Sequence, residues 1–188
     1  TALVCAGSLT IERAAYLLHE RGKAMQNAVP AGQGSMIAVL GMTMTEVEKE
    51  VSTVNKIEVC EIANDNSDFQ IVVSGTKKAI EILNENLRKK KKKGIILSVS
   101  APFHSSLMKK ASENMKDKLE KTNFLTPQPR VISNVTSKEY ESNDNIKVLL
   151  VDQIMSRVRW RESVNYMIRK GVDEFIEIGP GRVLSGLV

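Results

Sequence analysis

Long apolar runs, paired cysteines and aromatic side chains are all scarce in this sequence of 188 residues. Its longest apolar stretches, such as 95–99 and 175–178, are of strand length and fall far below the roughly 20 residues that a membrane span needs. The two cysteines, Cys5 and Cys60, lie far apart, with no paired spacing that could hold a metal or staple a small fold. The first residues include no basic segment ahead of an apolar one, so nothing indicates a secretory signal. The sequence predicts a globular chain in a reducing cytoplasm, with no membrane segment and with both cysteines buried.

Positive charge is confined to one segment. The formal net charge is +5, but six cations are consecutive, and the rest of the chain carries 21 cations against 22 anions. The run consists of Arg88, Lys89, Lys90, Lys91, Lys92 and Lys93. The excess positive charge of the chain is therefore confined to one local patch. The simplest interpretation of this patch is a solvated helix end, whose cations interact favourably with the negative end of the helix dipole.

Residues 35–99 alternate short strand patterns with amphipathic helix patterns. The strands are expected at 35–41, 59–63, 70–74 and 94–99, and the helices at 45–53 and 77–90. This order, βαββαβ, is that of a ferredoxin-like unit. We therefore predict a small lobe of this type at 35–99.

Residues 1–34 and 100–188 are expected to form a discontinuous large α/β lobe into which the small lobe is inserted. Thr10 can cap a helix of about 19 residues that Pro30 ends, and Ser105 or Ser106 can cap a later one. Further helices are expected at 146–155 and 163–170, and strands at 131–135 and 174–178. Clefts between lobes are favoured sites for ligands.

Arg21 interrupts the apolar stripe of its helix, which includes Ala14, Leu18 and Met25. A buried guanidinium needs an anion. The anion can be a carboxylate of the protein, in a structural salt bridge, or the carboxylate of a substrate held by two parallel hydrogen bonds.

Two further polar side chains need an explanation. His104 lies between a strand and a helix start, where its cationic form is disfavoured, so we expect it to be neutral near pH 7 and able to accept a proton. The alternative is a histidine that only packs in a loop. Gln153 lies on the inward face of its helix, where an amide usually holds a partner by hydrogen bonds in either a structural or a functional role.

Taken in order, these segments resemble the bacterial malonyl-CoA:acyl-carrier-protein transacylases over essentially all 188 residues. The start, TALVCAG, resembles the segment after the family's GHSxGE nucleophile elbow, and residues 21–26 match its RGxxMQ stretch. The remaining matches are 62–66 and 70–75 in the small lobe, SAPFHS at 100–105 around the catalytic histidine, 158–164, and 177–184.

In that family a serine attacks the malonyl thioester, a histidine takes its proton, and the phosphopantetheine thiol of acyl carrier protein receives the malonyl group. The resemblance implies an α/β-hydrolase-like large lobe, with His104 as general base and acid and Arg21 as partner of the malonyl carboxylate. The backbone carbonyl of Gln153 would orient the histidine, in place of the third member of a triad. Met25 would contribute to the substrate site, and the ring of Phe103 would crowd an α-methyl branch, which favours malonyl over methylmalonyl. No cofactor or metal is implied, and we expect a monomer.

The family's GxSxG pentapeptide and its N-terminal oxyanion-hole strand are absent from this sequence. By the family's spacing the nucleophile would precede Thr1 by five positions. We therefore expect a fragment that transfers nothing by itself. On the same resemblance, the cationic run 88–93 becomes a candidate docking patch for acyl carrier protein, which is small and strongly acidic.

Three other interpretations remain open. An acyltransferase domain of a polyketide synthase would share the histidine and arginine motifs, although the wording SAPFH favours the stand-alone enzyme. A basic RNA-binding module would need stacking platforms, whereas aromatics are 4% of the chain and none lies in 88–93. A pseudoenzyme or truncated product is the third interpretation.

Overall fold

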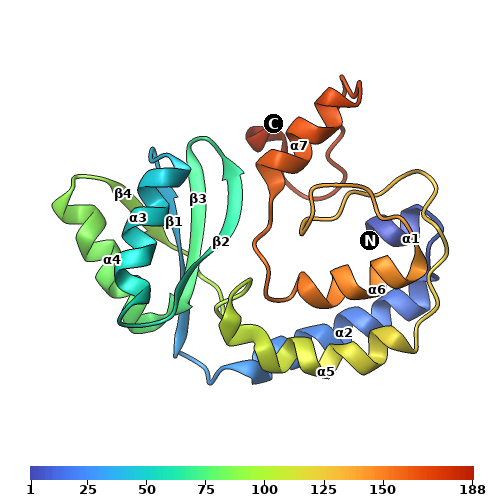
Figure 1. The fold of residues 1–188 in the computed structure, drawn as a ribbon, viewed down its shortest axis with the longest axis horizontal. Coiled ribbons are helices and arrows are strands. Elements are labelled where there is room, and N and C mark those ends of the chain that lie inside the picture. The colour runs from blue at the N-terminus through green and yellow to red at the C-terminus, as the bar shows by residue number, and fades with distance from the viewer.

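The computed structural model describes all residues, 1–188, as a mixed α/β chain with one antiparallel sheet (Figure 1). The sheet-containing lobe consists of β1 (Gly34–Leu40), α3 (Met44–Asn55), β2 (Cys60–Ser67), β3 (Gln70–Thr76), α4 (Lys77–Lys89) and β4 (Lys93–Ile96). The rest is helical, with α1 (Ala2–Cys5), α2 (Ile11–Ala28), α5 (Lys109–Glu120), α6 (Asn143–Asp152) and α7 (Trp160–Arg169), and with short 3-10 turns at Ser106–Met108 and Ser185–Leu187. None of the helices is both long enough and apolar enough to cross a bilayer.

The sheet has the strand order β2-β3-β1-β4, and every neighbouring pair is antiparallel. The element order βαββαβ predicted for 35–99 is the order observed, with boundaries shifted by a few residues. Local signals explain this agreement, because Thr43 and Thr76 cap α3 and α4 through their side chains, and Glu46 completes a capping box with Thr43.

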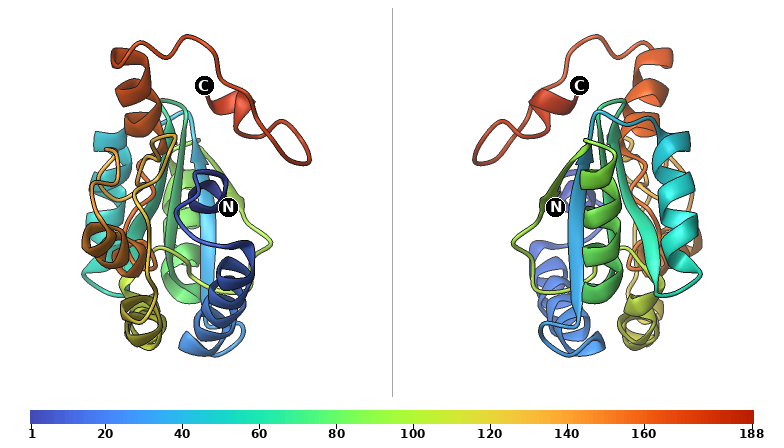
Figure 2. Two further views of the ribbon diagram at one scale, coloured as in Figure 1. Left: turned by 90° about the vertical axis from the view of Figure 1, so that its right-hand side faces the viewer. Right: turned by 90° about the vertical axis from the view of Figure 1, so that its left-hand side faces the viewer.

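The two helices of this lobe cover one face of the sheet (Figure 2). Their apolar sides and the strands enclose a core in which Ile37, Ile71, Ile80 and Leu83 are fully buried. Cys60 belongs to this core, and burial raises the pKa of its thiol to about 12, so it packs as a small hydrophobe. Cys5, by contrast, is exposed, so the prediction that both cysteines are buried is wrong for Cys5.

The opposite face of the sheet points toward the helical lobe. Met36, Ala38, Ala63 and Val72 form a small buried cluster there, and Phe103 packs against it. Phe103 also packs against the core of the helical lobe, so its ring joins the two hydrophobic regions.

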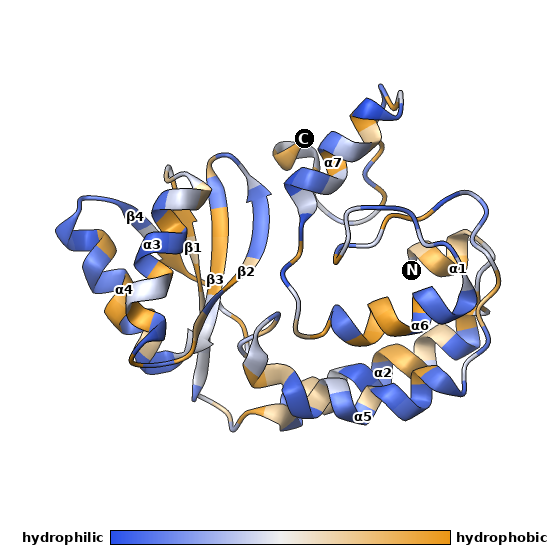
Figure 3. Ribbon diagram, viewed as in Figure 1, coloured by the Kyte–Doolittle hydropathy of each residue, from blue (hydrophilic) through white to orange (hydrophobic).

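The helical lobe has its own core between α2, α5 and α6, whose apolar faces turn toward one another (Figure 3). Thr10 caps α2 by accepting a hydrogen bond from the Arg13 amide, as expected. The residues Met108, Ala111, Met115 and Leu119 are all buried, which confirms the predicted apolar face of the helix after His104.

Two predicted strands of the large lobe are not observed. Residues 131–135 form a loop with one isolated bridge between Ile132 and Glu139, and residues 174–178 form no strand. A strand needs a continuous hydrogen-bonded ladder with a neighbour: residues 131–135 make only the isolated bridge with Glu139, and residues 174–178 pair with no strand within residues 1–188. Ile176 and Ile178 are therefore exposed.

Candidate active site

His104 lies in the connection between β4 and α5, two residues before the 3-10 turn that begins at Ser106. Its backbone φ is +57°, in the left-handed region that residues with a Cβ atom rarely adopt. Non-glycine residues in this region cluster at functional sites, where the surrounding structure holds them in place. His104 shares this conformation with Lys91 and Ser137, and among the three it is the residue with a side chain that can act as a base near neutral pH.

The imidazole of His104 makes both of its hydrogen bonds through Nδ1. Nδ1 lies 3.0 Å from the carbonyl oxygen of Gln153 and 3.2 Å from that of Ser156. Because both partners are acceptors, Nδ1 must carry the proton, which leaves Nε2 of a neutral ring with its lone pair available. This tautomer is the one that a general base requires.

Burial lowers the pKa of His104, and the positive charge of Arg21 acts in the same direction. The carbonyls of Gln153 and Ser156 oppose this shift by stabilising the imidazolium. The neutral form expected from the sequence therefore has burial as its main cause, rather than a position at a helix start.

Arg21 is half-buried on α2, and its Nε atom is buried without a hydrogen-bond partner. It forms no ion pair with any carboxylate of residues 1–188, so the structural salt bridge considered from the sequence is not observed. Burial lowers the pKa of its guanidinium. An unpaired cation in such surroundings is unfavourable, which leaves the group ready for an external anion.

A cavity of about 170 Å³ lies beside Arg21, inside the helical lobe rather than between the lobes. Most of its lining is apolar, from Leu17 and Leu18 on α2 and from residues of α1, α5 and α6, and Gln153 also borders it. Leu18 lies on the predicted apolar face of α2. It is nevertheless largely exposed, because this face lines the cavity at Leu18 instead of packing in a closed core.

The remaining predicted site residues lie around this centre. Phe103, next to His104, is half-buried between the two lobes, as described above. Met25 is 6% exposed and packs in the helical core, outside the lining of the cavity. Pro102 approaches the start of β1 so closely that a Cβ atom on Gly34 would lie 2.2 Å from its Cδ, so only glycine fits there.

The serine hydroxyls beside His104 are engaged elsewhere. Ser105 Oγ donates to the Pro102 carbonyl at 2.7 Å, and Ser106 Oγ donates to Glu61 at 2.8 Å. Ser156 meets the histidine through its carbonyl only. Within residues 1–188, no serine hydroxyl is hydrogen-bonded to the imidazole.

Only some of the cations in the run 88–93, at the end of α4, are without an ion-pair partner. Lys90 pairs with Glu50, and Lys92 lies 3.9 Å from Glu46, both on α3. Arg88, Lys89, Lys91 and Lys93 are exposed and form no ion pair. The run therefore combines a local ion-pair cluster with four unpaired surface cations.

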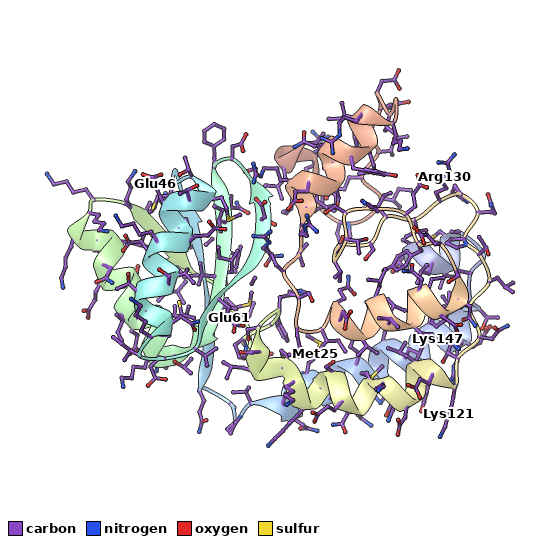
Figure 4. All side chains as sticks on the ribbon, viewed as in Figure 1. Met25, Glu46, Glu61, Lys121, Arg130 and Lys147 are labelled. Atoms are coloured by element: carbon purple, nitrogen blue, oxygen red, sulfur yellow. The ribbon has the colours of Figure 1, made fainter.

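Sequence reasoning missed two groups near His104. The Ser156 carbonyl gave no signal because any residue offers a carbonyl. Glu61, which lies where the sheet faces the helical lobe (Figure 4), looked like an ordinary strand carboxylate. The available signal was an acidic residue among the apolar residues of the strand expected at 59–63.

The comparisons with known proteins agree with one another. Residues 1–187 match the acyl transferase domain family. The chain is 43% identical over 190 residues to the malonyl CoA-acyl carrier protein transacylase of Bacillus subtilis (strain 168), covering 100% of this chain and 60% of that protein. The crystal structure of the malonyl CoA-acyl carrier protein transacylase from Clostridium perfringens superimposes with a TM-score of 0.94 at 40% identity, covering 99% of this chain and 59% of that one.

A third similar structure contains a partner. It is a malonyl-transacylase in complex with its type II PKS acyl-carrier protein, with a TM-score of 0.96 and 38% identity, covering 99% of this chain and 60% of that one. The chain thus spans about 60% of the length of the relatives it matches.

Proposed function

The chain belongs to the acyl transferase domain family, and from that premise we propose that its protein transfers a malonyl group from malonyl-CoA to the phosphopantetheine thiol of an acyl carrier protein. The similarity to malonyl CoA-acyl carrier protein transacylases over the full chain supports this proposal. The observation that carries the choice of acyl group is the buried, unpartnered Nε of Arg21. A β-carboxylated acyl group supplies the anion that this guanidinium lacks.

In the proposed mechanism His104 takes the proton of the attacking serine at Nε2 and later returns it to the leaving thiol. The carbonyls of Gln153 and Ser156 hold the ring and stabilise the imidazolium that forms. Because the neighbouring hydroxyls are engaged elsewhere, we assign the nucleophile to a serine outside residues 1–188. Phe103 would border the α-carbon of the acyl group and disfavour a methyl branch, and Met25 would support the site from the core.

The proposal extends to the architecture. We infer that residues 35–99 are a ferredoxin-like small lobe inserted into a large acyltransferase lobe, to which 1–34 and 100–188 belong. The βαββαβ order and the strand order of the sheet support the first part. The TM-scores support the second part.

A labelling experiment tests the proposed function. The full-length protein, incubated with radiolabelled malonyl-CoA, is expected to acquire one equivalent of hydroxylamine-sensitive label and to pass it to acyl carrier protein. A polypeptide of the 188 residues alone is expected to acquire none, because no hydroxyl is hydrogen-bonded to His104. Stoichiometric label on the 188-residue polypeptide would contradict the assignment of the nucleophile, and no label on the full-length protein would contradict the function.

The four unpaired cations of the run 88–93 are proposed to attract the acidic carrier protein, and three of them are changed in the test. Changing Arg88, Lys89 and Lys91 together to Gln is expected to slow transfer to carrier protein by roughly threefold to tenfold at low salt, since long-range attraction acts mainly on the association rate. Near physiological ionic strength, where the Debye length is about 8 Å, the difference is expected to shrink. Transfer to free pantetheine serves as the comparison at both salt concentrations.

Lys90 and Lys92 provide a matched control on the same segment, because their charges are already compensated by Glu50 and Glu46. Their double change to Gln is expected to affect transfer to carrier protein less than the triple change does. If both variants slow both acceptors alike, or if neither has any effect, the run is ordinary solvated surface.

A further inference from the structure

The outer strand of the sheet, β2, turns its free edge toward the helical lobe. Its pairing with β3 is irregular, because Ile62 pairs with Val73 and Asn64 pairs with Val72, which leaves Ala63 as an extra residue. Such bulges are frequent next to active sites, where they redirect a strand's bonding groups. Here the Ala63 carbonyl accepts a hydrogen bond from the Val158 amide at 2.8 Å, and the Asp65 amide donates to the Val158 carbonyl at 2.9 Å.

An ion pair reinforces this backbone contact. Asp65, with 1% of its side chain exposed, receives two parallel hydrogen bonds from Arg161, from Nε to Oδ1 and from Nη2 to Oδ2, both at 2.9 Å. The third guanidinium contact is with Asp68, also at 2.9 Å. A two-point pair of this kind fixes the position and the orientation of its partner. It therefore anchors the segment that enters α7 to β2.

This anchored segment, which leads to Arg161, comes directly after Gln153 and Ser156, whose carbonyls face His104. On its upstream side, Ser156 is fixed to the end of α6, since its amide donates to the Asp152 carbonyl at 2.8 Å. On its downstream side, Val158 and Arg161 fix it to β2, and the Arg159 amide donates to the Asn134 carbonyl of the loop 131–135 at 3.1 Å. The Ser156 carbonyl thus lies between a helix end and the strand edge.

A second carboxylate of β2, that of Glu61, holds the turn that follows His104. Glu61 accepts a hydrogen bond from the Ser106 amide at 2.6 Å through Oε2, and one from the Ser106 hydroxyl at 2.8 Å through Oε1. Ser106 is two residues after His104, whose left-handed backbone needs support from its surroundings. Glu61 provides that support from the other lobe.

We propose that β2 positions His104 against its carbonyl acceptors, with Glu61 fixing the histidine turn and the Asp65–Arg161 pair fixing the segment that supplies the Ser156 carbonyl. These three are positioning residues, because none of them touches the imidazole. The consequence for catalysis rests on the proposed function, in which His104 is the base. The positional claim does not, since it concerns only the Nδ1 contact.

The inference is tested by histidine NMR on the full-length protein, with a His104→Gln spectrum to identify the resonances. In wild type, the ring is expected as the Nδ1–H tautomer. In Arg161→Lys, which keeps the charge but cannot form the two-point pair, the carbonyl contact loosens. Since that contact stabilises the imidazolium, the pKa of His104 is expected to fall further and the Nδ1–H tautomer to lose population. The only ionised side chain that acts on this pKa besides the ring itself is Arg21 of α2, which is unchanged in all variants.

Asp65→Asn and Glu61→Ala are expected to act in the same direction, and Glu61→Gln, which retains an acceptor oxygen, to restore part of the effect. Glu58→Ala and Glu139→Ala are matched controls, because they remove ion pairs with Lys78 at 3.0 Å and with Arg130 at 2.9 Å that do not hold the His104 turn or the 153–161 segment. They are expected to leave His104 unchanged. Thermal unfolding shows which variants are folded.

An unchanged pKa and tautomer in folded Arg161→Lys and Glu61→Ala would overturn the proposal and leave these contacts as ordinary links between lobes. If Asp65→Asn does not fold, Arg161→Lys decides the question. Failure of the full-length protein to transfer malonyl groups would count against the proposed function alone, because the NMR measurement requires no substrate.

Discussion

Replacing His104 with alanine in the full-length protein is expected to slow acylation by malonyl-CoA by about 10² to 10⁴-fold, the usual contribution of a positioned general base. The reason is geometric: with Nδ1 bound to the carbonyls of Gln153 and Ser156, Nε2 is the nitrogen that can accept a proton. Single-turnover acylation with labelled malonyl-CoA isolates this step. A His104→Ala rate equal to that of wild type would show that the histidine only packs.

His19 supplies the control, because it is exposed on α2 and makes no contact with the site. His19→Ala is expected to acylate at the wild-type rate. The pH dependence adds a second check. Since burial places the pKa of His104 below its usual 6.5, the neutral base persists to lower pH, and the acylation rate is expected to fall only as pH drops through that lowered value. His104→Ala is expected to lose this acidic limb.

Arg21→Ala is expected to reduce malonyl transfer by about 30-fold relative to acetyl transfer. A hydrogen bond to a charged group contributes about 2 kcal/mol, and 1.36 kcal/mol corresponds to a factor of ten in rate. Only malonyl carries the carboxylate that the unpartnered Nε can bind. The measurement is the ratio of kcat/KM for malonyl-CoA to that for acetyl-CoA in wild type and variant.

The thermal stability of the Arg21→Ala variant distinguishes carboxylate binding from a structural role of Arg21. Because Arg21 has no anionic partner in the protein, its removal is expected to leave the Tm unchanged or to raise it. Arg13→Ala is the matched control on the same helix, since Arg13 donates to Thr122 at 2.8 Å and 3.1 Å and is expected to affect Tm but not acyl selectivity. Equal losses for both acyl groups in Arg21→Ala would contradict the carboxylate assignment.

The sequence predicted those parts of the fold whose signals are local. Thr10 was recognised from the sequence as the cap of α2, and the alternating strand and helix patterns gave the βαββαβ order; the structure adds that Thr43 and Thr76 cap α3 and α4. The strands predicted at 131–135 and 174–178 were wrong. An apolar run in the sequence does not show whether a neighbouring strand will be present to pair with it. The burial expected for Leu18 was also wrong. Helical periodicity shows which residues share one face of a helix, but it does not show which other element covers that face.

The site was predictable where a side chain carries the chemistry. Arg21 and His104 were both identified by charge or position before their surroundings were known. The carbonyl of Ser156 and the positive φ of His104 were not, because backbone groups are common to all residues and a strained conformation is imposed by tertiary contacts. Glu61 and Asp65 were not recognised, since their roles depend on which lobe the edge of β2 faces.

The contact of Gly34 with Pro102 has a mechanical consequence. The chain enters the sheet-containing lobe at Gly34 and leaves it by Pro102, so the two crossings meet at a single point. If the lobe swings as a rigid body, this point is its natural pivot, and displacement grows with distance from a pivot. His104 is two residues from Pro102 and would move least, whereas the far end of the β2–β3 hairpin lies far from the pivot and is held by the contacts of Asp65 and Asp68 with Arg161, which a swing would have to break.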